Sequence, residues 1–177
     1  MSGGLQKRQL GGRQVPVELG EGVVEGARLE QLDQPGVLDA TRCLAYWTQT
    51  AGAIPDDVMD ALEDRVYGCD ICQDVCPWNR GVEKRRAGRP LPEGSEPVIS
   101  LVDWLERDGR ELVADFDRLY VPKNEPRWLQ RNALVAVGNE GRSEDDPLAR
   151  GFVDDDDPVL RSAAARAVAR IGTSPGT

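Results

Sequence analysis

Four cysteines are the residues of this sequence whose type and spacing could do chemistry, and they are Cys43, Cys69, Cys72 and Cys76. The last three form the pattern C-x2-C-x3-C-P within the stretch YGCDICQDVCPWNR. Short spacers let neighbouring sulfurs converge on one inorganic centre, and the proline after the last cysteine stops the loop from continuing as a helix. The ending C-x3-C-P is the closing half of the cysteine run of bacterial ferredoxins, in which the last cysteine ligates the neighbouring cluster.

Three kinds of site fit this pattern. A four-iron cluster is favoured because it takes one thiolate per iron, and the four cysteines can supply them. A structural zinc bound by four thiolates usually uses two C-x2-C knuckles, which this sequence lacks. Buried or redox-reactive cysteines without a metal are the third possibility. The chain has no histidine, the commonest general base and neutral metal ligand. We predict the four cysteines as cofactor and metal ligands and assign no catalytic residue.

Two short helices must bring Cys43 to the cysteine loop. Asp39 can cap a helix that runs to about Thr50. Pro55 suits the first turn of a second helix that runs to about Arg65. Residues 80–98 are rich in glycine, proline and arginine and are expected to form a linker. The basic side chains of this linker are either a solvated loop or a local patch for RNA, and they are Lys84, Arg85, Arg86 and Arg89.

The C-terminal half is predicted to be helical, with a faint repeat. Ser100 and Asp108 each begin a helix with a capping motif. The segments 127–138 (RWLQRNALVAVG) and 161–172 (RSAAARAVARIG) each follow a proline and end at a glycine. Between them, Asp146-Pro147 should start a short helix through Phe152. The two segments are 34 residues apart. A repeat of this length is typical of helical-pair solenoids, but two alanine-rich helices of similar composition would give the same pattern. No strand is predicted.

Composition restricts the compartment and the partners. No stretch approaches the eighteen apolar residues of a membrane span. The N-terminal residues lack the apolar block of a secretory signal. We therefore expect a cytoplasmic protein with no membrane partner, in which clustered cysteines act as metal ligands or redox groups. The net charge of −9 argues against nonspecific binding to nucleic acid, because neutralising phosphates needs a basic surface. A local basic patch could still contact RNA.

Several stretches resemble the epoxyqueuosine reductase family, and they read PGVLDATRCLAYWTQ (35–49), GAIPDDV (52–58), RVYGCDICQDVCPWNR (65–80) and WLQRNALVAVGN (128–139). The resemblance covers nearly all of residues 34–177. It implies a mostly α fold, with a partial ferredoxin-like iron–sulfur module at 32–90 and a short HEAT-like helical-repeat tail at 91–177. Residues 1–31 match nothing in the family and are expected to be a poorly ordered N-terminal segment.

The resemblance also implies an activity. The family reduces an epoxide on the queuosine precursor at the anticodon wobble base of tRNA. It uses a cobalamin-binding catalytic domain and two four-iron clusters, which would pass electrons to the cobalt. The helical tail helps to hold the tRNA. Carried over to this chain, the likeness implies a monomer with a 4Fe-4S cluster and the anticodon region of tRNA as its partner.

The sequence departs from the family pattern in two ways. The cobalamin domain with its acidic catalytic residue is missing, and so is the first cysteine run, where the region near Ala27 reads GVVEGARLEQ. In the family, the last cysteine of each run ligates the neighbouring cluster. By this pattern, Cys43, Cys69 and Cys72 would hold one cluster and Cys76 would serve the other. The chain could then complete at most one 4Fe-4S cluster, weakly bound and oxygen-sensitive. We expect it to be a truncated or frame-shifted product of a longer gene.

Three functions remain open. The first is the C-terminal part of a tRNA epoxyqueuosine reductase, which transfers electrons but needs a cobalamin domain or another missing partner for turnover. The second is a stand-alone 4Fe-4S electron carrier. The third is an RNA- or protein-binding remnant without redox activity. Its candidate RNA contacts are Arg127, Arg131 and Asn132, which could equally lie on a solvated helix face. Trp128 is expected in the core, and Trp78 is expected either to shield a cluster or to pack ordinarily.

Overall fold

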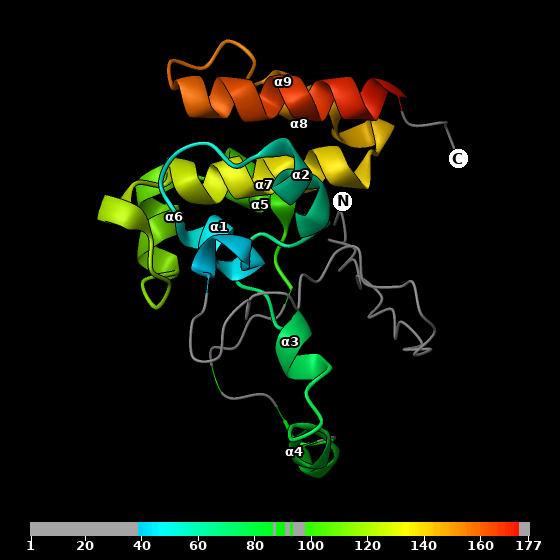
Figure 1. Cartoon of the computed structure of the whole chain (residues 1–177). Coiled ribbons are helices and arrows are strands. Elements are labelled where there is room, and N and C mark those ends of the chain that lie inside the picture. The colour runs from blue at the N-terminus through cyan, green and yellow to red at the C-terminus, as the bar shows by residue number, and fades with distance from the viewer. Residues whose placement is uncertain (1–38, 87, 91–92, 94–97, 174–177) are drawn as a thin grey trace, which may run out of the picture.

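The computed structural model describes residues 39–86, 88–90, 93 and 98–173, and within these ranges all regular structure is helical (Figure 1). The 3-10 helices are η1 (Ala40–Arg42), η2 (Pro122–Asn124) and η3 (Ser143–Asp145). The α-helices are α1 (Leu44–Gln49), α2 (Asp56–Leu62), α3 (Ile71–Asp74), α4 (Arg80–Arg86), α5 (Leu101–Glu106), α6 (Gly109–Asp115), α7 (Arg127–Glu140), α8 (Asp146–Arg150) and α9 (Pro158–Thr173). The prediction of a mostly helical chain is confirmed for this part. The segment 1–31 lies outside the described residues.

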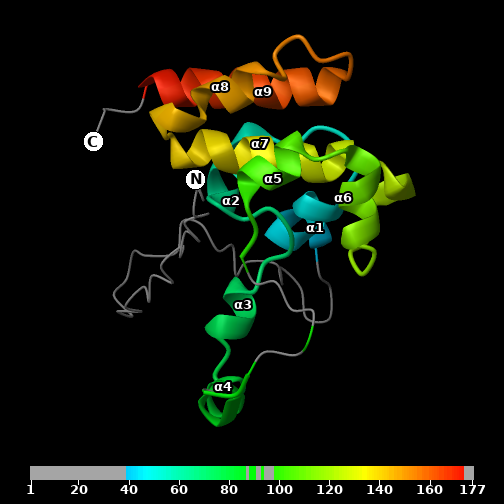
Figure 2. The same cartoon turned by 180° about the vertical axis from the view of Figure 1, so that it is seen from behind.

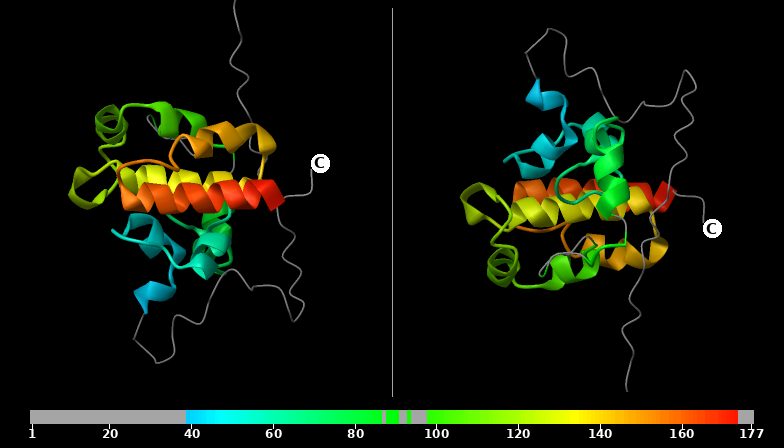
Figure 3. Two further views of the ribbon diagram at one scale, coloured as in Figure 1. Left: turned by 90° about the horizontal axis from the view of Figure 1, so that it is seen from above. Right: turned by 90° about the horizontal axis from the view of Figure 1, so that it is seen from below.

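Helix α7 is the centre of the molecule. It lies beneath α9 and above α1 (Figures 1 and 2), while α1 and α2 lie on one flank and α5 and α8 on the other (Figure 3). Leu134 belongs to the main apolar cluster, together with Trp104 and Leu160. Its neighbour Val135 belongs to a second cluster with Ile54 and Leu62. A helix that is covered on nearly all sides in this way holds the other elements in place.

The helix caps follow the predicted signals. The Ser100 hydroxyl accepts a hydrogen bond of 3.2 Å from the Asp103 backbone N–H. The Asp108 carboxylate accepts hydrogen bonds from the backbone N–H groups of Arg110 and Glu111, at 2.9 and 3.3 Å. Each cap satisfies donors that have no partner within the helix. The predicted starts of α5 and α6 are therefore confirmed.

The first predicted helix is interrupted at Cys43. Asp39 does act as a cap, since its carboxylate accepts a hydrogen bond of 3.0 Å from the Thr41 backbone N–H, but it caps only the short helix η1. Cys43 is extended, with φ −97° and ψ 124°, and α1 begins after it. The Trp47 indole N–H donates to the Thr41 carbonyl oxygen at 2.6 Å. That oxygen is the acceptor that a continuous helix would need.

Three other predicted boundaries were wrong. The second helix ends at Leu62, because Glu63 adopts a positive φ of 52°. The region 80–98 is not all linker, since α4 spans Arg80–Arg86, a run rich in good helix formers. Helix α8 starts at Asp146-Pro147 as predicted but ends at Arg150, before Phe152. Among the described helices, none combines the length and the apolar character needed to cross a membrane.

Helices α7 and α9 approach each other closely along small residues. Ala163, Ala164 and Ala167 are buried on α9. A Cβ atom added to Gly138 on α7 would lie 2.7 Å from the Ala167 Cα atom. Only a glycine allows this separation, because the obstructing atom belongs to the opposite backbone and cannot rotate away. Gly138, which sequence analysis placed only at a helix end, therefore sets the spacing of the helix pair.

Replacing Gly138 with alanine should destabilise the chain by about 1–3 kcal/mol, because the two helix backbones would have to separate. Urea denaturation followed by circular dichroism would measure this change. Gly172→Ala is the matched control, since a Cβ atom at that position meets nothing within 4 Å. It should leave stability unchanged or raise it by up to about 1 kcal/mol through helix propensity. Equal effects at both positions would contradict the close-contact argument.

Candidate functional site

The four cysteines come from three separate places in the fold. Cys43 occupies the N-cap position of α1 without a side-chain capping bond, and Cys69 lies in the loop that follows α2. Cys72 is in the single turn of α3, and Cys76 follows the end of that turn. The Asp70 carbonyl oxygen accepts hydrogen bonds of 2.8 and 2.9 Å that form this turn. All four thiols are free; Cys72 is exposed and the others are half-buried.

The sulfur of Cys69 is influenced by two other cysteines. Burial raises the pKa of its thiol most, and the proximity of Cys72 and Cys43 raises this pKa further. A hydrogen bond from the Ile71 backbone N–H and the charge of Arg65 act in the opposite direction. Cys76 is not among the groups that shift this pKa. Cys43, although distant in sequence, is therefore brought within electrostatic range of the cysteine loop.

The cysteines do not gather around one point as the ligands of a single ion would. In the part of the chain that the structure describes, no group of three or more cysteine or carboxylate side chains is close enough to hold one metal ion. Zinc needs all of its sulfur ligands about 2.3 Å from one centre. In a cubane each thiolate binds a different iron atom, so the sulfurs lie further apart. Cys43 and Cys72, which both act on the pKa of Cys69, are the residues that could take this second arrangement.

Arg131 and Asn132, candidate RNA contacts by sequence, are not on the surface. Arg131 is 2% exposed and Asn132 is fully buried. Both side chains bind backbone carbonyl oxygens of α1 and of the segments that follow α1 and α2. They cannot contact a nucleic acid in this arrangement, so that prediction was wrong. Their position on a helix rich in alanine and valine was the available signal for burial.

The aromatic and basic residues considered for RNA or cluster contact differ in whether they are buried, paired within the protein or exposed. Trp128 is buried in the main apolar cluster, as predicted. The Arg127 guanidinium lies over its ring and pairs with Glu125 and Asp157, so this arginine is held by the protein itself. Trp78 is 89% exposed, so the expectation that it packs against the protein was wrong. The side chains of Lys84, Arg85 and Arg89 are exposed and available to a partner.

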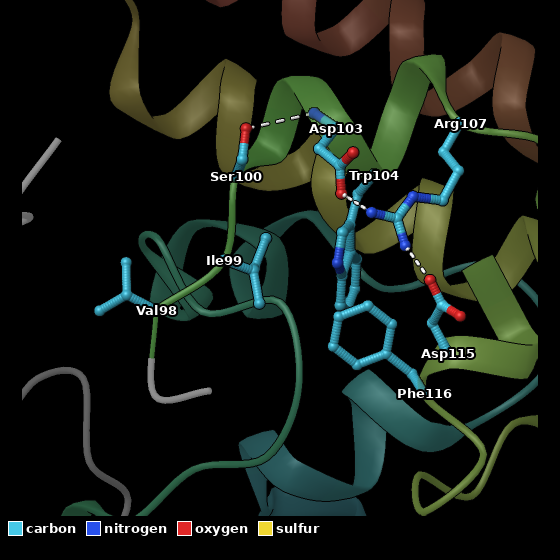
Figure 4. A pocket seen from close by; sticks show the side chains of 8 residues that line it. All are labelled: Val98, Ile99, Ser100, Asp103, Trp104, Arg107, Asp115 and Phe116. Atoms are coloured by element: carbon cyan, nitrogen blue, oxygen red, sulfur yellow. Dashed lines mark hydrogen bonds and ion pairs between the residues drawn. The ribbon is translucent and has the colours of Figure 1, made fainter. Parts of the chain in front are cut away.

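The structure contains a cavity of about 360 Å³ between α5 and α6 (Figure 4). No cysteine lines it. Arg107 spans one side through ion pairs to Asp103 and Asp115, at 2.7 and 2.6 Å. Trp104 packs edge-on against Phe116 with a centroid distance of 5.0 Å. The indole N–H of Trp104 is buried and has no hydrogen-bond partner. The cavity therefore lies beside the main apolar cluster rather than at the cysteine site.

Thr48 is a site residue that sequence analysis missed. It is buried, and its hydroxyl accepts a hydrogen bond of 2.9 Å from the Gly68 backbone N–H, directly before Cys69. The same hydroxyl donates to the Ala45 carbonyl oxygen in α1. This contact joins the helix that follows Cys43 to the loop that carries Cys69. A threonine inside a short helix gives no sequence signal for such a role.

Comparisons with known proteins show which proteins the chain is similar to. Residues 29–79, which include all four cysteines, match the family model of a 4Fe-4S double cluster binding domain. An epoxyqueuosine reductase of Bacillus cereus is 37% identical over 145 residues, which cover 80% of this chain and 37% of that protein. The chain thus spans little more than a third of the length of the curated reductases it matches.

Solved structures give the same result. The structure of epoxyqueuosine reductase from Bacillus subtilis matches with a TM-score of 0.63 and 34% identity, over 77% of this chain and 37% of that one. A crystal structure of epoxyqueuosine reductase with an epoxyqueuosine-modified stem loop of tRNA-Tyr matches with the same TM-score and identity, over 78% of this chain and 37% of that one. These sequence and structural matches show that the chain belongs to the epoxyqueuosine reductase family.

Proposed function

We propose that the chain is an electron-transfer part of a tRNA epoxyqueuosine reductase and that it holds one four-iron cluster through Cys43, Cys69 and Cys72. The observation that carries this proposal is the 2.9 Å hydrogen bond from the Gly68 N–H to the Thr48 hydroxyl, which joins the helix after Cys43 to the residue before Cys69. Both Cys43 and Cys72 raise the pKa of the Cys69 thiol, in keeping with this arrangement. A four-iron cluster that transfers electrons needs several thiolates at one place. The match to a double cluster binding domain supports the same assignment.

The chain's own groups prepare this site for a cluster. A bound four-iron cluster would accept and donate single electrons. The Ile71 backbone N–H donates to the Cys69 sulfur, and Arg65 lies near enough to favour its thiolate form. Hydrogen bonds to cluster sulfurs and the exposure of the site set the reduction potential. Cys76 would provide the remaining ligand or serve a second cluster whose other ligands these 177 residues do not supply.

The substrate and the acceptor follow from the family. We propose that the electrons pass to a cobalamin-bearing catalytic domain, which reduces epoxyqueuosine to queuosine in the anticodon region of tRNA. The exposed basic side chains of Lys84, Arg85 and Arg89 are the candidate contacts to phosphate. In this proposal, residues 32–90 form a partial ferredoxin-like module, residues 91–177 form a short HEAT-like tail, and the protein works as a cytoplasmic monomer.

Iron and sulfide analysis of the anaerobically purified or reconstituted chain tests this function. We expect roughly four irons and four sulfides per chain and a broad visible absorption that bleaches on reduction with dithionite. The chain alone should not reduce epoxyqueuosine, whereas adding a cobalamin-loaded catalytic domain should give turnover. Iron content near zero after reconstitution would contradict the proposal.

A stand-alone electron carrier is the second candidate. The net charge of −9 favours it, because a strongly acidic protein is repelled by tRNA. Binding of an anticodon stem loop, followed at several salt concentrations, separates the two functions. Weakening of this binding with rising salt would support the reductase assignment. Reversible reduction without measurable affinity for the stem loop would support the carrier.

A further inference from the structure

We infer that Arg131 and Asn132 of α7 are positioning residues that fix the Cys43 segment against the Cys69 loop. Their relevance to a cluster rests on the proposed function, but their geometry is independent of it. Neither cysteine segment has enough structure of its own to define a site. Arg131 and Asn132, which are adjacent on α7, supply hydrogen bonds to backbone carbonyl groups near both cysteines.

Asn132 joins the two cysteine segments directly. Its side-chain amide donates one hydrogen bond to the Thr48 carbonyl oxygen at 2.7 Å and another to the Val66 carbonyl oxygen at 2.8 Å. Thr48 lies in α1, and Val66 lies shortly before Cys69. A fully buried amide that spends both donors on two separate segments fixes their spacing, because either donor left unpaired would be costly.

Arg131 holds the end of α1. Its guanidinium donates to the carbonyl oxygens of Trp47, at 3.1 Å, and Thr50, at 3.0 Å, and also to that of Gly52. Burial lowers its pKa to about 10, so the group still carries its charge at neutral pH. Carbonyl groups at a helix end have no partner within the helix. The buried Arg131 cation therefore binds the free carbonyl groups at the C-terminal end of α1, the helix that begins directly after Cys43.

The two residues act as one unit. The side-chain oxygen of Asn132 accepts hydrogen bonds from the Arg131 Nε and Nη2 atoms, at 3.0 and 2.9 Å. This contact orients the amide so that its NH₂ group faces both cysteine segments. Helix α1 has only six residues, too few to persist alone in water. Its placement, and with it the placement of Cys43, depends on this unit.

Thr48 extends the connection to the cysteine loop. Its carbonyl oxygen accepts from Asn132 while its hydroxyl accepts from the Gly68 N–H. Gly68 has a φ of 73°, a left-handed conformation that directs the chain into Cys69. A continuous series of hydrogen bonds thus runs from α7 through Thr48 to the residue before Cys69.

Asn139 provides a matched control on the same helix. Its amide donates to the carbonyl oxygens of Met59 and Glu63, at 2.7 and 2.9 Å. These acceptors lie in and just after α2, and neither lies in α1 or between Val66 and Cys69. The same residue type thus makes the same kind of clamp in the same helix, with a different target. Substitutions at both positions separate a general loss of stability from a specific effect on the cysteines.

The experiment compares Asn132→Leu with Asn139→Leu in the full chain. In the first readout, Cys72 and Cys76 are replaced by serine and the metal-free chain is treated with dibromobimane, which bridges two nearby thiols. Mass spectrometry gives the rate at which Cys43 and Cys69 become bridged. We expect Asn132→Leu to slow bridging about tenfold, in line with the loss of buried hydrogen bonds, and Asn139→Leu to match the parent chain. Equal rates in the two variants would overturn the inference.

Thr48→Val covers the case in which Asn132→Leu does not fold. It keeps the volume of the side chain but removes the acceptor of the Gly68 N–H. It should speed hydrogen exchange at Gly68 and slow bridging, while Asn139→Leu leaves both at the parent values. Unchanged exchange and bridging in Thr48→Val would count against the inference.

A second readout uses the reconstituted protein with all four cysteines present. The rate of iron loss to a chelator under argon should rise in Asn132→Leu and Thr48→Val, and stay at the parent value in Asn139→Leu. If the unmodified chain takes up no iron, the proposed function fails. The bridging and exchange rates of the metal-free chain still decide whether Asn132 positions the cysteines.

Discussion

Replacing Cys69 with serine should abolish cluster retention. Cys69 is one of the three proposed ligands, and both Cys43 and Cys72 act on the pKa of its thiol. A serine hydroxyl is a hard and weakly acidic ligand that replaces a thiolate poorly on iron. We expect iron in the anaerobically reconstituted variant to fall from roughly four per chain to near zero. Elemental analysis and visible absorption would measure this loss.

Serine substitutions of the other cysteines test which of them ligate the proposed cluster and which serves a second one. Cys43→Ser and Cys72→Ser should lose iron as Cys69→Ser does. Cys76→Ser should keep most of its iron, because the last cysteine of such a run ligates the neighbouring cluster in ferredoxins. A loss in Cys76→Ser as large as that in Cys69→Ser would contradict the assignment of three thiolates. It would show instead that all four cysteines hold one cluster.

Replacing Trp104 with alanine should destabilise the chain by about 3–5 kcal/mol, which is the range for emptying a large aromatic site in a core. The Trp104 side chain is 1% exposed, belongs to the main apolar cluster and packs against Phe116. Its loss would also remove the wall of the cavity between α5 and α6. Chemical denaturation followed by far-ultraviolet circular dichroism would measure the free energy of unfolding.

Trp104→Phe is the informative comparison. It should cost only about 1–2 kcal/mol, because most of the apolar contact remains. The indole N–H has no hydrogen-bond partner, so its removal breaks no bond and leaves no buried acceptor unsatisfied. A cost as large as that of the alanine variant would show that the N–H group has a partner after all.

Helix starts could be predicted from the sequence where the capping side chain lies close in the chain to the N–H groups that it binds. Ser100 and Asp108 mark helix starts because their side chains satisfy N–H groups only two or three residues away. The cysteine site was recognisable for the same reason, since three of its members fall within one short loop. The long helices α7 and α9 were also predictable, because their small and apolar residues continue over several turns.

The remaining features depend on partners that sequence spacing does not reveal. Arg131 and Asn132 resemble surface residues by type, yet their partners are backbone carbonyls some eighty positions earlier. Every residue has a carbonyl, so no pattern of side chains marks which ones will be bound. The break at Cys43 likewise depends on the Trp47 indole reaching back to the Thr41 carbonyl oxygen.

The exposure of Trp78 gives the chain an optical signal near its cysteines. An indole surrounded by water emits at longer wavelength than a buried one and is quenched readily by dissolved iodide. Trp104 and Trp128 are buried and Trp47 is partly covered, so the iodide-sensitive, red-shifted emission comes chiefly from Trp78. Trp78 follows Cys76 by two positions, which makes its fluorescence a natural reporter of what happens in the cysteine loop.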